Sequence, residues 1–258
     1  MAAFASSKRE LLEVLDPSAL ARLASLGVAQ GTNALTPEAE GNVLSLDWPE
    51  LEQVLPDRGL PRGVVEIASP ITKQGAMRGG ATTIALAAIR AVHASDPRAW
   101  CAWITEANAP PLYAPAVAQA GVDLERLLVV RPQPADLART VVKVASSGAF
   151  DLVVVDAPAG LDGRLTIADG SSRTAPRRIP AASRARVDGS VVVRKLALAA
   201  EEQGTTFLIL TNVFTSRAVP WPVALRIEVE RRPEAIALRV TKDRRGRASS
   251  QHVVRVAC

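Results

Sequence analysis

Residues 64–83 read VVEIASPITKQGAMRGGATT, and this stretch decides the expected fold. The apolar segment Val64–Ala68 is typical of a buried strand, and Thr82–His93 continues with the apolar spacing of a helix. Between them, Gly75 and Gly80 have the spacing of the phosphate-binding loop G-x-x-x-x-G-K-[ST], in which backbone N–H groups surround phosphate oxygens. The sequence therefore predicts a strand, a glycine-rich loop and a helix in succession.

The loop lacks the lysine that such loops use to neutralise phosphate. Thr82 and Thr83 provide the expected hydroxyls, but Ala81 stands where the lysine belongs. We therefore expect the loop to be a degenerate nucleotide site. We expect that the protein is not an enzyme and that it binds no cofactor there. The alternative is a working ATPase that binds ATP and magnesium, in which Lys73 or Arg78 on the preceding loop replaces the missing cation.

Apolar segments alternate with helical ones beyond this point, which indicates an α/β fold with a mostly parallel central sheet flanked by helices. We expect further strands at Trp100–Thr105, Arg126–Val130, Leu152–Val155 and Thr206–Thr211. We expect helices at Leu112–Gln119, Ala135–Ser146 and Gly189–Gln203. Strands this apolar should be buried on both faces. The last strand-like segments have no helix between them and should form an antiparallel C-terminal extension: Val223–Val229, Ala235–Thr241 and His252–Val256.

The first 41 residues differ in pattern from the rest. Leucines recur at helical spacing in Ser7–Leu26, and Gly27–Gly41 has the composition of a loop. We expect an N-terminal helical arm and linker over residues 1–41 and a core domain over residues 42–258. The arm leucines are candidates for contacting a partner: Leu11, Leu12, Leu15, Leu20 and Leu23.

Polar residues at the ends of three predicted strands are the remaining candidates for chemistry, because open α/β sheets bind ligands at the carboxyl ends of their strands. Asp156 could hold the water shell of a magnesium ion, or simply cap a loop. Glu106 could orient an attacking water, or be an exposed loop residue. Asn212 could sense a γ-phosphate, although a turn residue is the simpler interpretation.

The net charge of +5 hides an asymmetry between the two parts of the chain. Residues 161–258 hold 18 Lys and Arg against 9 Asp and Glu, a net charge of +9, and residues 1–160 carry 13 − 17 = −4. This imbalance suggests an anionic partner such as DNA, or a solvated basic surface. The candidate DNA-binding residues are Arg164, Arg173, Arg177, Arg178, Arg184, Arg186, Arg244, Arg245 and Arg247.

Two cysteines, Cys101 and Cys258, are too few for a disulfide framework or a zinc site, so we expect no metal centre. No apolar segment is long enough to span a membrane, and Met1–Lys8 lacks the pattern of a signal peptide. The expected location is the cytoplasm.

Taken together, residues 60–247 resemble the RecA recombinase core, and the chain is identified as a member of the ImuA family, RecA-like proteins encoded beside mutagenic translesion polymerases. The segments that carry the resemblance are Gly59–Ile67, Gly80–Thr83, Tyr113–Asp123, Leu127–Pro132, Asp151–Asp156 and Leu208–Asn212. The resemblance places Asp162–Asp188 and Thr215–Pro222 at the two DNA-binding loops, the second being too short for that role. It also implies that RecA's C-terminal domain is missing.

The resemblance implies a role in the DNA-damage (SOS) response. A RecA-like body without the phosphate lysine should bind RecA and restrain recombination, which favours error-prone translesion synthesis with ImuB and a DnaE-type polymerase. Ser7–Leu26 would dock on RecA, as the arm of a recombinase docks on the next subunit. The rival hypotheses are the ATPase described above and a single-stranded DNA-binding module, which can coexist with RecA binding.

Overall fold

A computed structural model of the chain describes residues 43–70, 80–158, 160–161, 188–214, 221–247, 249 and 251–256. The chain divides into two units, Met1–Ala39 and Glu40–Cys258, and every described residue belongs to the second. Several predicted site residues lie outside the described residues: Leu11, Leu12, Leu15, Leu20, Leu23, Lys73, Gly75, Arg78, Arg164, Arg173, Arg177, Arg178, Arg184 and Arg186. Their roles stay predictions.

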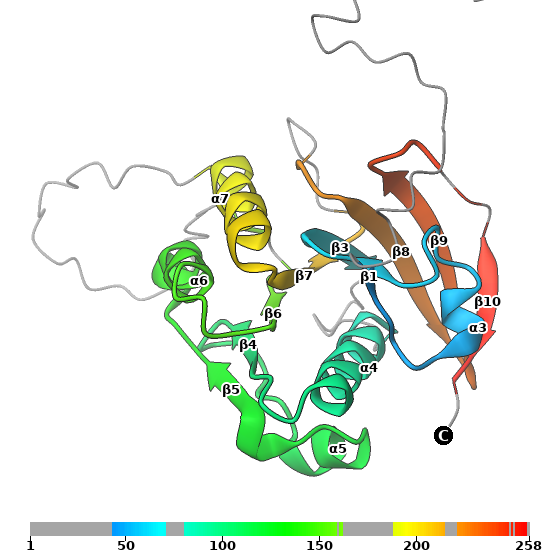
Figure 1. Ribbon diagram of the computed structural model, residues 1–258, viewed down its shortest axis with the longest axis horizontal. Coiled ribbons are helices and arrows are strands. Elements are labelled where there is room, and N and C mark those ends of the chain that lie inside the picture. The colour runs from blue at the N-terminus through cyan, green and yellow to red at the C-terminus, as the bar shows by residue number, and fades with distance from the viewer. Residues whose placement is uncertain are drawn as a thin grey trace, which may run out of the picture. The chain divides into compact units, whose positions relative to one another are not determined.

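An eight-stranded sheet, in the order β10-β9-β8-β3-β7-β6-β4-β5, is the centre of the described structure (Figure 1). The parallel strands are β3 (Val64–Ser69), β4 (Cys101–Thr105), β5 (Leu127–Val130), β6 (Leu152–Asp156), β7 (Thr206–Asn212) and β8 (Leu225–Arg232). The antiparallel strands are β9 (Ala235–Asp243) and β10 (His252–Arg255). The predicted α/β fold with a mostly parallel sheet and an antiparallel C-terminal extension is thus confirmed.

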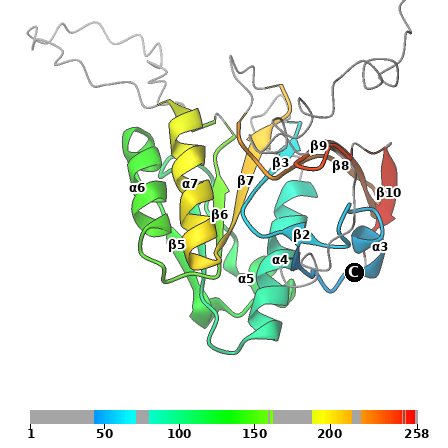
Figure 2. The same ribbon diagram turned by 45° about the horizontal axis from the view of Figure 1, so that its top comes forward.

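Helices cover both faces of the parallel part of the sheet (Figures 1 and 2). The helices α4 (Gly80–Ser95) and α5 (Ala114–Gln119) lie on one face, and α6 (Leu137–Ala145) and α7 (Gly189–Gln203) lie on the other. Short 3-10 turns, η2 (Leu124–Arg126) and η3 (Pro134–Asp136), precede β5 and α6. Of the helices described, none is long and apolar enough to cross a membrane.

Alternate residues of each central strand are buried in different hydrophobic cores, one on each face of the sheet. In β6, Leu152 and Val154 join the cluster under α4, whereas Val153 and Val155 join the cluster under α6 and α7. This alternation follows from the two-residue period of a strand. It explains why the sequence of β6 is continuously apolar, since neither face is exposed to solvent.

Two strand predictions are wrong in part. β5 is not buried on both faces: Leu128 is 44% exposed and Val129 is 42% exposed, because β5 is an edge strand whose pairing is with β4. β8 is not antiparallel to the rest of the sheet, since it pairs with β3 in parallel register. The connection over residues 213–224 is long enough to return the chain to the other end of the sheet before β8 begins.

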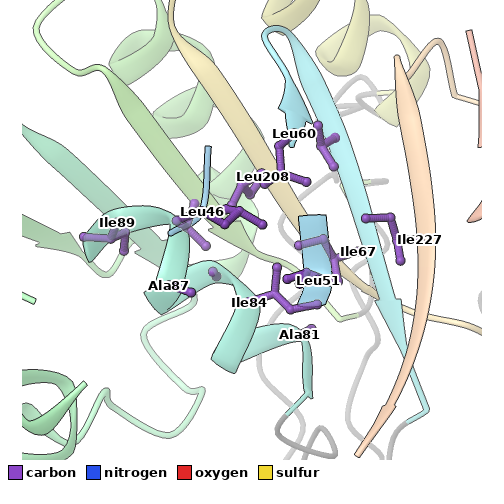
Figure 3. Close-up of a cluster of buried hydrophobic side chains, with 14 of the residues drawn as sticks. Leu46, Leu51, Leu60, Ile67, Ala81, Ile84, Ala87, Ile89, Leu208 and Ile227 are labelled. Carbon is purple, nitrogen blue, oxygen red and sulfur yellow. The ribbon is translucent and has the colours of Figure 1, made fainter. Parts of the chain in front are cut away.

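A small segment before β3 completes one of the two cores. It contains β1 (Val43–Leu44), the short helix α3 (Pro49–Glu52) and β2 (Leu60–Pro61), and β1 pairs antiparallel with β2. Leu46 and Leu51 are buried in the cluster that also contains Ile84 of α4 (Figure 3). This segment therefore packs beside α4 and fixes the position of that helix.

Candidate functional site

Two carboxylates follow neighbouring strands at the carboxyl edge of the parallel sheet. Asp156 is the last residue of β6, and its register partner is Thr105, the last residue of β4. Glu106 follows Thr105 directly. Neighbouring strands lie about 4.8 Å apart. The fold therefore brings together two site residues that the sequence separates by fifty positions.

This edge is where an open α/β sheet would bind a ligand. The helix that follows β4 is α5, and the helix that follows β6 is α7; they lie on opposite faces of the sheet (Figure 2). A crevice forms at the carboxyl ends of strands whose connections diverge in this way. Asp156 and Glu106 lie at that position, as the sequence predicts.

Burial raises the pKa of both carboxyl groups, and the charge of Glu106 adds to the shift at Asp156. Burial, and then the nearby Glu106 carboxylate, raises the pKa of Asp156 from 3.8 to about 6. Burial also raises the pKa of Glu106 above its ordinary value. Among the described residues, no Lys, Arg or His forms an ion pair with either group. In the described part of the chain, the site is thus an acidic pair without a compensating cation.

Neutral polar groups lie at the ends of the neighbouring strands. The hydroxyls of Ser69, at the end of β3, and Thr105 are buried and find no hydrogen-bond partner among the described residues. Asn212 ends β7 beside Ser69, and its side-chain oxygen accepts a hydrogen bond of 3.1 Å from the backbone N–H of Phe214. This contact is that of a turn residue, the simpler of the two interpretations of Asn212.

The first two residues of α4 pack closely against neighbouring elements. The side chain of Ala81 is 0% exposed and belongs to the cluster that contains Ile84 and Leu51 (Figure 3). Gly80 lies so close to β8 that a Cβ atom there would be 2.7 Å from Cγ1 of Val229. Both residues at the end of the degenerate loop are therefore tightly enclosed by neighbouring elements.

The two threonines of the motif are half-buried on the first turn of α4. Thr83 also lines a cavity on the flank of this helix, together with Trp48. Thr82 does not line that cavity. The two hydroxyls therefore have different surroundings, and the sequence motif alone does not distinguish them.

The loop that carries Glu106 is held by a residue to which sequence reasoning gave no role. The guanidinium of Arg131, just after β5, donates hydrogen bonds to the carbonyl oxygens of Ala107, at 2.9 Å, and Ala109. The backbone N–H of Ala107 donates to the carbonyl of Pro132 at 2.8 Å. Arg131 is thus a positioning residue for the Glu106 loop. Its only sequence signal is a cation directly after an apolar strand.

The three C-terminal arginines differ in how far carboxylates of the protein neutralise their charge. Arg247 forms ion pairs of 2.8 Å with both Asp57 and Asp243, and Arg245 lies 3.1 Å from Asp57. Arg244 is exposed and forms no ion pair with another described residue. The charges of Arg245 and Arg247 are therefore largely compensated within the protein, and of these three candidates Arg244 is the most available to bind phosphate.

Other reactive groups in the described residues have structural surroundings. Cys101 is buried in β4, and burial raises the pKa of its thiol to about 12, so it is not nucleophilic at neutral pH. His93 is buried in α4, and burial lowers its pKa. Within the described ranges, no three His, Cys, Asp or Glu side chains are placed to hold a metal ion.

Comparison with known proteins adds a family relationship to this geometry. A family model described as the RecA N-terminal domain matches residues 33–218, a range that includes the strand-end carboxylates and the degenerate loop. Protein RecA of Deinococcus radiodurans is 32% identical over 174 residues, which cover 66% of this chain and 43% of that protein.

Two further relatives align over shorter lengths. Protein RecA of Arthrospira platensis is 39% identical over 112 residues, which cover 42% of this chain and 28% of that protein. Protein RecA of Thermus aquaticus is 35% identical over 128 residues, which cover 48% of this chain and 34% of that protein. The chain thus spans less than half the length of each of these three relatives.

Proposed function

Because this chain belongs to the RecA N-terminal domain family, we propose that it is a non-catalytic relative of RecA that binds RecA itself. In this proposal it restrains recombination during the DNA-damage (SOS) response and thereby favours error-prone translesion synthesis. ImuB and a DnaE-type polymerase are its further proposed partners, and direct contact with DNA is a secondary possibility that centres on Arg244 among the described residues.

The single observation that carries the proposal is the environment of Ala81. This residue occupies the lysine position of the motif, and its methyl group is fully buried against Ile84. The acidic pair of Asp156 and Glu106 then has no compensating cation in the described residues. A nucleotide triphosphate is strongly anionic, so a site with two carboxylates and no fixed cation should repel it. This supports a RecA-like protein that has kept the fold but does not bind and hydrolyse ATP.

The open edge of the sheet supports the second half of the proposal, RecA binding. β5 pairs with β4 on one side, and among the described strands none pairs with its other side. Leu128 and Val129 are exposed on this strand. An edge strand with free backbone groups and apolar side chains can accept an extended segment of a partner as an additional strand. We propose that RecA binds here.

The experiment measures the affinity of the purified full chain for RecA of the same organism by biolayer interferometry. We expect micromolar or tighter binding, and inhibition of strand exchange in proportion to occupancy. Val129→Lys should weaken binding by at least about tenfold, equivalent to ~1.4 kcal/mol. The matched control is Val253→Lys, because Val253 is a more exposed valine (57%) on β10, the strand at the opposite edge.

Two results would overturn the proposal. One is the absence of both binding and inhibition at micromolar excess of the wild-type chain. The other is an equal loss of affinity in Val129→Lys and Val253→Lys, since it would place the contact away from β5. Circular dichroism of both variants must match that of the wild type, so that loss of folding is not mistaken for loss of contact.

The placement of the two carboxylates at neighbouring strand ends supports one alternative, a weak ATPase in which bound cations offset their charge. In that case Asp156 would hold the water shell of magnesium and Glu106 would position the attacking water, with Lys73 or Arg78 supplying the cation. Isothermal titration with ATP and magnesium separates the two functions. Saturable binding that disappears in Asp156→Ala would favour the ATPase, whereas no heat of binding at millimolar ATP favours the accessory role.

A further inference from the structure

The helix α7 has an exposed face that carries apolar side chains. The helix lies beside α6 (Figure 2), and its buried face contributes residues such as Leu196 to the core cluster on that side of the sheet. On the opposite face, Val191 is 45% exposed and Leu198 is 58% exposed. Single exposed apolar residues are common, but these two are seven residues apart and therefore lie on one stripe of the helix. Another helix could cover this stripe.

Charged residues fill the other positions of the exposed face. Arg194 and Lys195 lie between the two apolar residues, and Glu201 and Glu202 follow them. All four side chains are exposed, and none of them forms an ion pair with another described residue. The basic and acidic pairs are seven residues apart, about 10.5 Å along the axis, which is too far for an ion pair within the helix.

The two glutamates lie at the less favourable end of α7. They belong to its last turn, in which there is no basic residue. The carbonyl groups at the C-terminus of a helix form the negative end of its dipole, so carboxylates there are disfavoured and cations are favoured. A cation supplied by another molecule would therefore stabilise this end of the helix.

The order of the charges is self-complementary about Leu198. Arg194 and Lys195 precede it by four and three residues, and Glu201 and Glu202 follow it by three and four. In a two-fold symmetric antiparallel pair centred on Leu198, the basic residues of each copy face the acidic residues of the other. At about 100° per residue, Arg194 and Glu201 share one flank of the stripe, and Lys195 and Glu202 share the other. Each residue therefore faces an opposite charge on the same flank.

We propose that the exposed face of α7 is the interface of a homodimer, in which two copies of α7 pack antiparallel around Leu198. Leu198 packs against Leu198 of the second copy, and Arg194 and Lys195 pair with the two glutamates of that copy. One helix pair buries less than the roughly 1,200 Å² of a standard interface, so the dissociation constant should be about 10–100 µM. The proposed RecA contact is separate, because α7 and β5 share no residue.

The first test measures the mass of the purified full chain by sedimentation velocity, without RecA, at about 1–200 µM. We expect the average mass to rise with concentration from 27.2 kDa toward twice that value. Arg194→Glu combined with Lys195→Glu should raise the dissociation constant at least about tenfold, because like charges then face each other. Adding Glu201→Lys and Glu202→Lys exchanges all four charges and should restore the constant to within about threefold of the wild type.

The second test locates the two-fold axis by disulfide crosslinking. The variants Leu198→Cys and Val191→Cys are compared in a Cys258→Ser background, in which the buried Cys101 is the remaining native thiol. A disulfide requires Cα atoms within about 7 Å. Leu198 lies opposite its own copy, whereas the two copies of Val191 would be about 21 Å apart along the axis. Copper–phenanthroline should therefore crosslink the Leu198→Cys variant and not the matched control.

Four results would each overturn the inference. They are a chain that stays monomeric at the highest concentration, a dimer that the charge reversal does not weaken, a full charge exchange that does not restore it, and equal crosslinking at the two positions. The RecA-binding experiment uses a different protein and a different surface, so either proposal can fail without the other.

Discussion

Replacing Asp156 by asparagine should make the protein more stable at neutral pH. Burial and the neighbouring Glu106 raise the pKa of Asp156 from 3.8 to about 6. The native state therefore binds the proton more tightly than the unfolded chain, and stability from this group is fully present below pH 3.8 and is lost as the pH rises through about 6. Asparagine stays neutral and escapes this loss.

The size of the effect follows from the shift. A change of about two pKa units corresponds to ~3 kcal/mol at about 1.36 kcal/mol per unit. By the same linkage relation, the gain of Asp156→Asn over the wild type should be about 3 kcal/mol at pH 7.5 and about 1 kcal/mol at pH 4.5. The change of this stability gain with pH tests the explanation better than its absolute size. The other titrating groups are the same in both proteins, so their contributions cancel.

Urea denaturation of both proteins at these two pH values, followed by circular dichroism, measures the difference. Glu106→Gln should reduce the gain from Asp156→Asn, since the charge that helps to raise the pKa of Asp156 is removed. Asp136→Asn, at an exposed aspartate, is the control and should change stability by less than about 0.5 kcal/mol. A destabilised Asp156→Asn, or a gain that does not vary with pH, would refute the reasoning.

Four further substitutions test the packing around the degenerate loop and the basic C-terminal cluster by the same urea assay. Ala81→Lys should lower stability by about 2–3 kcal/mol without creating ATP binding, because residue 81 is fully buried; a stable variant that binds ATP would contradict this. Gly80→Ala should cost about 1–2 kcal/mol because its Cβ would meet Val229, and an unchanged midpoint would show that this contact yields. Arg247→Ala should cost about 1–2 kcal/mol through its two carboxylate partners, whereas the exposed Arg244→Ala should cost less than about 0.5 kcal/mol; equal effects would argue against these ion pairs.

Most helices and strands of the described residues are predictable from the sequence because their signals are local. Gly189–Gln203 was expected as a helix and is α7, whose N-cap Asp188 accepts a hydrogen bond from the N–H of Ser190 and whose C-cap Gly204 has φ = 71°. The continuous apolar character of β6 likewise indicated a strand with both faces buried. Such patterns indicate whether a segment is buried, but they do not indicate which strands or helices lie next to it.

For the same reason, the predictions for β5 and β8 were wrong in part. Leu127–Val130 is as apolar as β6, yet the order of the strands leaves it at the edge of the sheet. The direction of β8 depends on the path of the connection that precedes it, which no periodicity encodes. The ion pairs of Arg245 and Arg247 with Asp57 also join distant segments, so charge counting suggested a free basic cluster where the fold compensates much of the charge.

The sequence by itself determined the α/β class, the glycine-rich loop with its alanine, and the three strand-end polar residues, because each depends on residue type and short-range spacing. Only the tertiary structure decided that Asp156 and Glu106 lie beside each other, that Ala81 is enclosed in the core and that α7 packs against the sheet with Leu198 exposed. These relations join residues far apart in the chain, and they arise when burial of apolar surface selects one arrangement of the helices and strands.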